Sequence, residues 1–81
     1  MDFTGNDNYG KPKQAYLDKI AELGDTLFVQ EAERAIWLSA YASNNRRSDY
    51  HWQADACSAE ARRRGKPELY EQAWSRAVAT A

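Results

Sequence analysis

The sequence predicts an all-α protein, a compact bundle of three to four short helices with an irregular N-terminal arm. Three observations lead to this prediction. Apolar residues recur at helical spacing in four segments, Gly, Pro and Ser separate these segments, and no stretch alternates as a β-strand would. The expected helices cover residues about 12–23, 26–43, 48–64 and 67–79. Residues 1–11 form the arm, and residues 12–81 form one helical bundle domain.

The arm and the first helix are marked by their local composition. Residues 1–10 read MDFTGNDNYG, which is rich in Gly, Asn and Asp and favours irregular structure. The first helix is expected from Pro12, because proline suits the first helical position, where a backbone N–H is not needed. Leu17 and Ile20 recur at helical spacing, and Gly24 ends the helix, since glycine accepts the left-handed backbone common at helix C-termini.

The second helix is the most apolar of the four, and we expect it at the centre of the core. Asp25 or Thr26 can cap its N-terminus through a side-chain oxygen. Small and apolar residues repeat along one face of it at helical spacing. That face consists of Phe28, Val29, Ala32, Ala35, Ile36 and Ala40.

The third and fourth helices have clear boundary signals. Ser48 is an N-cap for the third helix, Asp49 suits its positive first turn, and Gly65 stops it. Pro67 starts the fourth helix. Because every linker is short, neighbouring helices should run roughly antiparallel. The inner face of the fourth helix is expected to hold Leu69, Tyr70, Ala73, Trp74, Ala77 and Val78.

Composition excludes several classes of site. The chain has one Cys and one His, whereas a structural zinc site needs four such ligands, so no metal and no cofactor is expected. A single Cys cannot form an internal disulfide, which favours a reducing compartment. No apolar stretch approaches the roughly 20 residues of a membrane span. We therefore expect a cytoplasmic protein that does not interact with membranes.

Charge is unevenly distributed along the chain, although the net charge is only −1. Residues 1–33 carry three Lys against seven Asp and Glu, while residues 34–81 carry eight Arg and Lys against five Asp and Glu. The basic half is nearly all Arg, whose planar guanidinium binds carboxylates and phosphates. This pattern indicates a two-sided surface and not a strong polycation.

Trp37 and Tyr41 are the first candidate site, for binding a protein partner. They lie one helical turn apart and opposite the apolar face of the second helix. Trp and Tyr are enriched at interfaces, because they combine large contact area with a polar group. Arg34, Arg46 and Arg47 would form the polar rim. The alternative is that the arm or another helix covers the two aromatic residues.

A second candidate is a DNA- or RNA-binding surface, as in a small helix-turn-helix-like regulator. A helix N-terminus binds anions, and the start of a recognition helix enters the major groove. The alternative is an ordinary turn, with His51 paired to Asp55 and Glu60 paired to Arg64. The nucleic-acid-binding residues would be Arg46, Arg47, His51, Gln53, Arg62, Arg63 and Arg64.

Catalysis is not expected. His51 and Asp55 share a helical face, and such a pair could orient a general base. A nucleophile is missing, because Cys57 lies well round the helix from His51. No catalytic residue is therefore assigned, and the protein is not expected to be an enzyme.

Residues 33–74, ERAIWLSAYASNNRRSDYHWQADACSAEARRRGKPELYEQAW, resemble the short open reading frames of bacteriophages and prophages. The resemblance implies a small helical accessory protein that acts by binding, for example an inhibitor or modulator of a host protein or nucleoprotein complex such as a defence complex. It assigns no role to any residue. Taken together, the sequence predicts a non-enzymatic protein-binding module. Its partner would be a host protein or a second copy of the chain in a homodimer.

Overall fold

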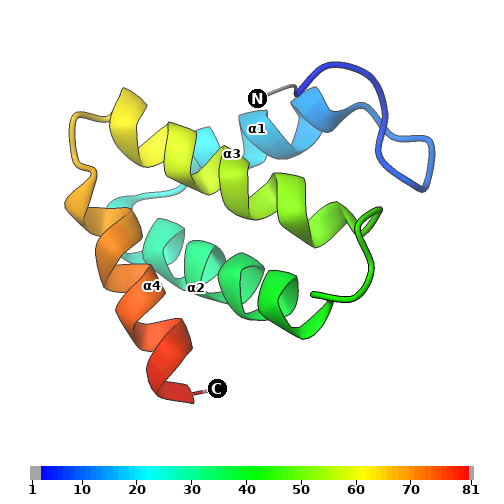
Figure 1. Ribbon diagram of the computed structural model, residues 1–81. Helices are drawn as coiled ribbons and strands as arrows, with labels where there is room; N and C mark the ends of the chain where they lie inside the picture. Colours follow the sequence, from blue (N-terminus) through cyan, green and yellow to red (C-terminus); the bar gives the residue numbers. More distant parts are fainter. Residues whose placement is uncertain (1–2, 81) are drawn as a thin grey trace.

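The protein folds into four α-helices in the computed structural model, which describes residues 3–80 (Figure 1). They are α1 (Lys13–Glu22), α2 (Asp25–Tyr41), α3 (Asp49–Arg63) and α4 (Glu68–Thr80), and no strand occurs within residues 3–80. The predicted all-α bundle is confirmed, with helix bounds close to those expected. Residues 1, 2 and 81, which belong to the predicted arm and domain, lie outside the described residues.

Helix α2 is central, as predicted, and packs against both α3 and α4. Figure 1 shows α2 and α3 side by side and running in opposite directions, as their short linker favours. Helix α1 packs along α3. Helix α4 runs steeply across α2 (Figure 1). The tight turn at Gly65, whose φ is +71°, redirects the chain at this point.

The core is built mainly from alanine. Its largest fully buried side chains are Phe28, Ile20 and Cys57. Small side chains let the helices approach closely, but they bury little apolar area per residue, so the few large side chains provide much of the hydrophobic stabilisation. The predicted inner face of α2 is buried except for Ala40, which is exposed. The core alanines are Ala32, Ala35, Ala54, Ala56, Ala61, Ala73 and Ala77.

The helix boundaries follow most of the signals in the sequence, but the start of α2 differs from the prediction. Neither Asp25 nor Thr26 is its N-cap, and no side-chain hydrogen bond caps it. Ser48 caps α3 as expected, because its hydroxyl oxygen accepts a hydrogen bond from the Tyr50 N–H at 3.3 Å. Gly65 adopts the left-handed backbone just after α3. Gly24 does not, since its φ is −67° and it serves as the N-cap of α2. The left-handed explanation therefore holds for Gly65 and not for Gly24.

Arg64 joins the ends of three helices. Its guanidinium donates to Glu60 Oε2 at 2.7 Å within α3 and to Asp25 Oδ1 at 3.0 Å at the start of α2. One terminal nitrogen also donates to the carbonyl oxygens of Ile20 and Leu23, at 2.9 and 2.7 Å. The last carbonyls of a helix lack intrahelical partners, so Arg64 caps the C-terminus of α1. The sequence predicted only the pair with Glu60.

A polar cluster of Tyr16, Glu31 and Cys57 joins α1, α2 and α3. The Tyr16 hydroxyl donates to Glu31 Oε2 at 2.7 Å, and Cys57 Sγ lies 3.5 Å from the same hydroxyl oxygen. Burial is the largest cause that raises the pKa of the Cys57 thiol, to about 11, and burial also raises the pKa of Tyr16. Both groups are therefore uncharged in the folded protein at neutral pH.

We expect the protein to lose stability as the pH rises from about 9 to about 11. In this range the unfolded chain releases the Cys57 proton, whereas the folded chain retains it, so deprotonation favours unfolding. The pKa difference between 9.0 and about 11 corresponds to a loss of about 2–3 kcal/mol in the free energy of unfolding. Urea denaturation at pH about 8 and about 10.5 measures this loss. The free energy of unfolding of Cys57→Ala should fall less between the two pH values than that of the wild type. An equal fall would contradict the assignment to Cys57.

Candidate functional site

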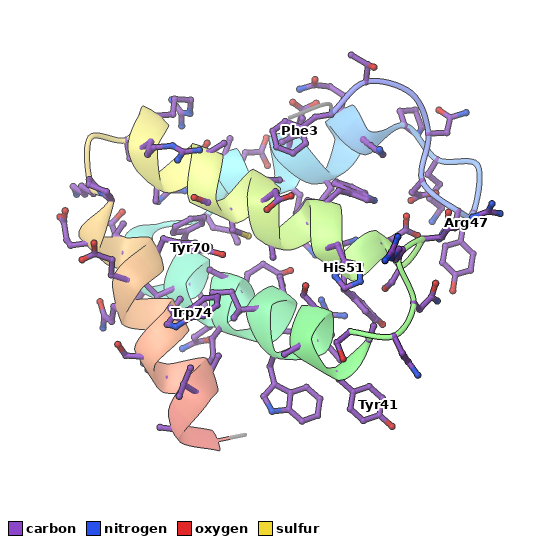
Figure 2. The ribbon with its side chains drawn as sticks, in the orientation of Figure 1. Phe3, Tyr41, Arg47, His51, Tyr70 and Trp74 are labelled. Atoms are coloured by element: carbon purple, nitrogen blue, oxygen red, sulfur yellow. The ribbon has the colours of Figure 1, made fainter. Side chains whose placement is uncertain are left out.

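An apolar groove of about 670 Å³ lies between α2, α3 and α4. Figure 2 shows Tyr70 and Trp74 along α4 on one side and His51, at the start of α3, on the other. The volume of the groove falls within the range of roughly 300–1,000 Å³ that is usual for ligand sites. The lining residues are Ile36, Trp37, Ser39, Ala40, Tyr41, His51, Ala54, Asp55, Tyr70, Trp74, Ala77 and Val78.

Large exposed side chains stand on two walls of the groove. On α2, Trp37 is 38% exposed and Tyr41 is 77% exposed, and their rings stack at a centroid distance of 5.6 Å with an interplanar angle of 10°. On α4, Trp74 is 53% exposed and Val78 is 59% exposed. The sequence left open whether Trp37 and Tyr41 are covered by another segment. The structure places both at the surface.

Trp74 and Val78 were predicted on the inner face of α4, and this prediction is wrong. Ala73 and Ala77 take the inner positions and are buried. Each large residue follows a buried alanine by one position, which turns its side chain about 100° round the helix toward the groove. The sequence did contain a signal for this arrangement. The apolar stripe of α4 is wider than the face that a helix at the edge of a bundle can bury, so part of the stripe must remain exposed.

His51 forms the polar end of the groove and closes the C-terminus of α2. Its Nε2 lies 3.1 Å from the Ala42 carbonyl oxygen and 2.8 Å from that of Asn45. Carbonyl oxygens only accept, so Nε2 carries a hydrogen, and Nδ1 can accept from the Ser39 hydroxyl at 2.7 Å. The predicted pairing of His51 with Asp55 is therefore wrong. A histidine that satisfies the last carbonyls of a helix acts as a C-terminal cap.

Asp55 is the one charged residue among those that line the groove. Within residues 3–80, no hydrogen bond or ion pair engages its carboxylate. The carboxylate lies near Tyr70, since burial raises the pKa of that phenol most and the charge of Asp55 raises it further. The groove therefore combines aromatic walls with one unpaired acid.

The three arginines of the predicted rim lie outside the groove. Arg34 forms an ion pair with Glu31 at 3.4 Å and lines a separate shallow hollow that also touches Trp37. Arg46 and Arg47 line another hollow, beside the N-terminal arm. Of the five residues predicted for partner binding, the structure brings only Trp37 and Tyr41 to the groove.

The N-terminal arm is held against the start of α3. The Asn8 side-chain amide donates to the Arg47 carbonyl oxygen at 2.7 Å. The Asn8 N–H approaches both carboxylate oxygens of Asp49 at 3.2 Å, and Asp49 Oδ1 also accepts from Trp52 Nε1 at 2.9 Å. Asp49 thus organises the arm in addition to its place in the first turn of α3.

The residues of the nucleic-acid hypothesis do not form one patch. Arg46 and Arg47 precede α3, while Arg62, Arg63 and Arg64 lie at its other end, about 22 Å away for a helix of 15 residues. The pairing of Glu60 with Arg64 is confirmed at 2.7 Å, and Arg63 binds the same carboxylate at 2.7 Å. Both ring nitrogens of His51 are engaged, and Gln53 is partly buried with its Oε1 unpartnered among residues 3–80.

Residues 3–80 provide neither a metal site nor a membrane-spanning helix. No group of three or more His, Cys, Asp or Glu side chains in this part of the chain could hold a metal ion. None of the helices there has the length and apolar character needed to cross a membrane. These findings leave the groove as the principal candidate site.

Comparison with known proteins adds no further constraint on the groove. No family model, no curated protein and no solved structure matches the chain. Its function is therefore argued from the residues and their geometry.

Proposed function

We propose that the protein is a non-enzymatic protein-binding module and that the groove between α2, α3 and α4 is its binding site. One observation carries the proposal: Trp37, Tyr41 and Trp74 are exposed around the groove, while the core is built mainly from alanine. A small chain gains stability by burying its largest apolar side chains. Large aromatic residues left at the surface of such a chain are typical of a binding site.

The proposed partner is a protein of a host cell, and the module would act by covering part of that partner's surface. The resemblance of residues 33–74 to phage and prophage reading frames supports this direction. A phage accessory protein of this kind would inhibit or modulate a host protein or a nucleoprotein complex, such as a defence complex. The groove provides apolar contact area for such binding and needs no catalytic group.

Binding of DNA or RNA is the alternative function. Exposed Arg46 and Arg47 beside the N-terminus of α3 support it, because guanidinium groups and helix N-termini both bind phosphate. The binding of Arg63 and Arg64 to Glu60 counts against it, since these cations already have an anionic partner.

The test is affinity capture from host-cell extract, with and without nuclease, read by mass spectrometry. The double variant Trp37→Ala/Tyr41→Ala should lose the captured protein, with affinity reduced by about 100-fold or more, because aromatic hot spots contribute about 2 kcal/mol or more each. Its helical circular dichroism should remain close to that of the wild type, since both side chains are exposed.

Tyr9→Ala is the matched control, because Tyr9 is an exposed aromatic residue that does not line the groove. It should capture the partner as the wild type does. Capture that disappears after nuclease treatment would favour the nucleic-acid alternative. Loss of helical content in the double variant would mean that Trp37 and Tyr41 support the fold, and the site assignment would then fail.

A further inference from the structure

We infer that the groove binds an amphipathic α-helix of the partner, and that a Lys or Arg of this helix pairs with Asp55. This inference rests on the proposed function and specifies the chemistry of the partner. Three properties of the groove lead to it: its shape, the scarcity of free backbone groups along its helical walls, and its single unpaired carboxylate.

The shape fits a helix. Helix α4 lies on one side of the groove and the start of α3 on the other, and the central helix α2, which packs against both, joins them. The α4 wall extends from Tyr70 to Val78, about 12 Å along the helix axis. Over this length a bound helix presents about two turns, so its apolar residues at positions i, i+3 or i+4, and i+7 would meet the aromatic walls.

The helical walls favour a bound helix over an extended peptide. The lining residues from Ile36 to Tyr41, from His51 to Asp55 and from Tyr70 to Val78 all belong to helices. Most of their N–H and C=O groups are used within those helices. The exceptions lie in the last turns of α2 and α4: the Ala42 carbonyl oxygen meets His51, and the Val78 carbonyl is too near the end of α4 for an intrahelical bond. An extended peptide would bury its own backbone polar groups without partners, which is unfavourable, whereas a helix satisfies its backbone internally.

The charge of the bound helix follows from Asp55. A partner that covers the groove removes water from this carboxylate, and a buried carboxylate without a partner is strongly unfavourable. Among residues 3–80 no Lys or Arg lies within ion-pair distance of it, although Asp55 also lines the neighbouring hollow that contains Arg46 and Arg47. The partner must therefore supply one, and a Lys or Arg on the polar edge of an amphipathic helix does so. An acidic helix would instead be repelled.

The inference is tested with a displayed library of helical peptides of about 18 residues, selected against the intact protein. Selected sequences should show apolar residues at i, i+3 or i+4, and i+7, with Lys or Arg enriched at one position. Binding of a synthetic peptide is then followed by tryptophan fluorescence, because Trp37 and Trp74 line the groove. Replacing the peptide's basic residue by Ala should weaken binding by about three- to tenfold.

Charge reversal provides the sharper test. Asp55→Lys should lower the affinity for the basic peptide by more than tenfold. The same variant should bind more tightly a peptide in which Glu replaces the basic residue. Asp55→Asn, which keeps size and polarity, should weaken the basic peptide without favouring the Glu peptide. Glu22→Lys is the control, because Glu22 is an exposed acid on α1 outside the groove, and it should leave both affinities unchanged.

The possible failures can be distinguished. Peptide binding that requires Trp37 and Trp74 but not Asp55 would overturn this inference and leave the proposed function standing. Selected peptides without apolar residues at helical spacing would do the same. Peptides that bind without these aromatic residues, or a selection that yields none, would overturn this inference and remove support from the groove as a protein-binding site. Concentration-dependent dimerisation that Trp74→Ala abolishes would also overturn it, because the occupant would then be a second copy of the chain.

Discussion

Replacing Arg64 by Met will lower the free energy of unfolding by about 2–4 kcal/mol, because a largely buried guanidinium loses its hydrogen bonds to Glu60, to Asp25 and to the end of α1, although Glu60 keeps its pair with Arg63. The Arg64 side chain is only 11% exposed, and that of its partner Glu60 is 6% exposed. The change also leaves the Leu23 carbonyl without its donor and the Ile20 carbonyl with only the Leu23 N–H, at 3.3 Å. A chain of 81 residues has a total stability of about 4–12 kcal/mol, so the variant will lose a large fraction of it.

The matched control for this prediction is Arg63→Met. Arg63 binds the same Glu60 carboxylate at 2.7 Å, but its side chain is 64% exposed. Exposed ion pairs contribute about 0–1 kcal/mol, so the control should lose no more than that. Urea denaturation followed by circular dichroism measures both variants. Equal losses in the two variants would show that burial of the Arg64 contacts does not determine their contribution.

Replacing Phe28 by Ala will lower the free energy of unfolding by about 3–5 kcal/mol, through lost apolar burial and the cavity that remains. Phe28 is fully buried, and most of the core around it is alanine, which cannot extend to fill the space. Tyr41→Ala is the matched control, since it removes an aromatic ring that is 77% exposed from the same helix. It should lose about 1 kcal/mol or less.

The effects of Phe28 and Arg64 should also depend on each other. The Arg64 guanidinium carbon lies 4.5 Å from the centroid of the Phe28 ring, which allows a cation–π contact. A double-mutant cycle should give a coupling of about 0.5–2 kcal/mol. A coupling near zero would mean that the ring and the guanidinium contribute independently.

The positions of the helices could be predicted because their boundaries depend on local chemistry. Pro12, Ser48, Gly65 and Pro67 act through their own backbone preferences or through bonds to neighbouring residues. The core face of α2 was predictable for a related reason, since a helix flanked by others must turn its apolar stripe inward. The failure at α4 has the opposite origin, because the steep crossing of this helix is not encoded in the length of its linker.

The candidate site could be predicted only in part. Trp37 and Tyr41 were identified because they lie opposite the apolar face of their own helix, a relation that helical periodicity defines. Trp74 and Asp55 were missed as site residues, because their roles depend on where α4 crosses α2 and α3. His51 was assigned a partner within its own helix, whereas the structure gives it Ser39, Ala42 and Asn45 from the preceding segment.

The sequence by itself determined the helical class, most helix boundaries, the central place of α2 and the position of Trp37 and Tyr41 opposite the apolar face of their helix. Each of these depends on interactions within a few residues or on the period of a single helix. The tertiary structure alone decided that Arg64 is buried while Arg63 is exposed, that Trp74 faces a groove, and that Asp55 stands in it unpaired. These outcomes depend on how helices distant in sequence cross, and periodicity within one helix does not contain that information.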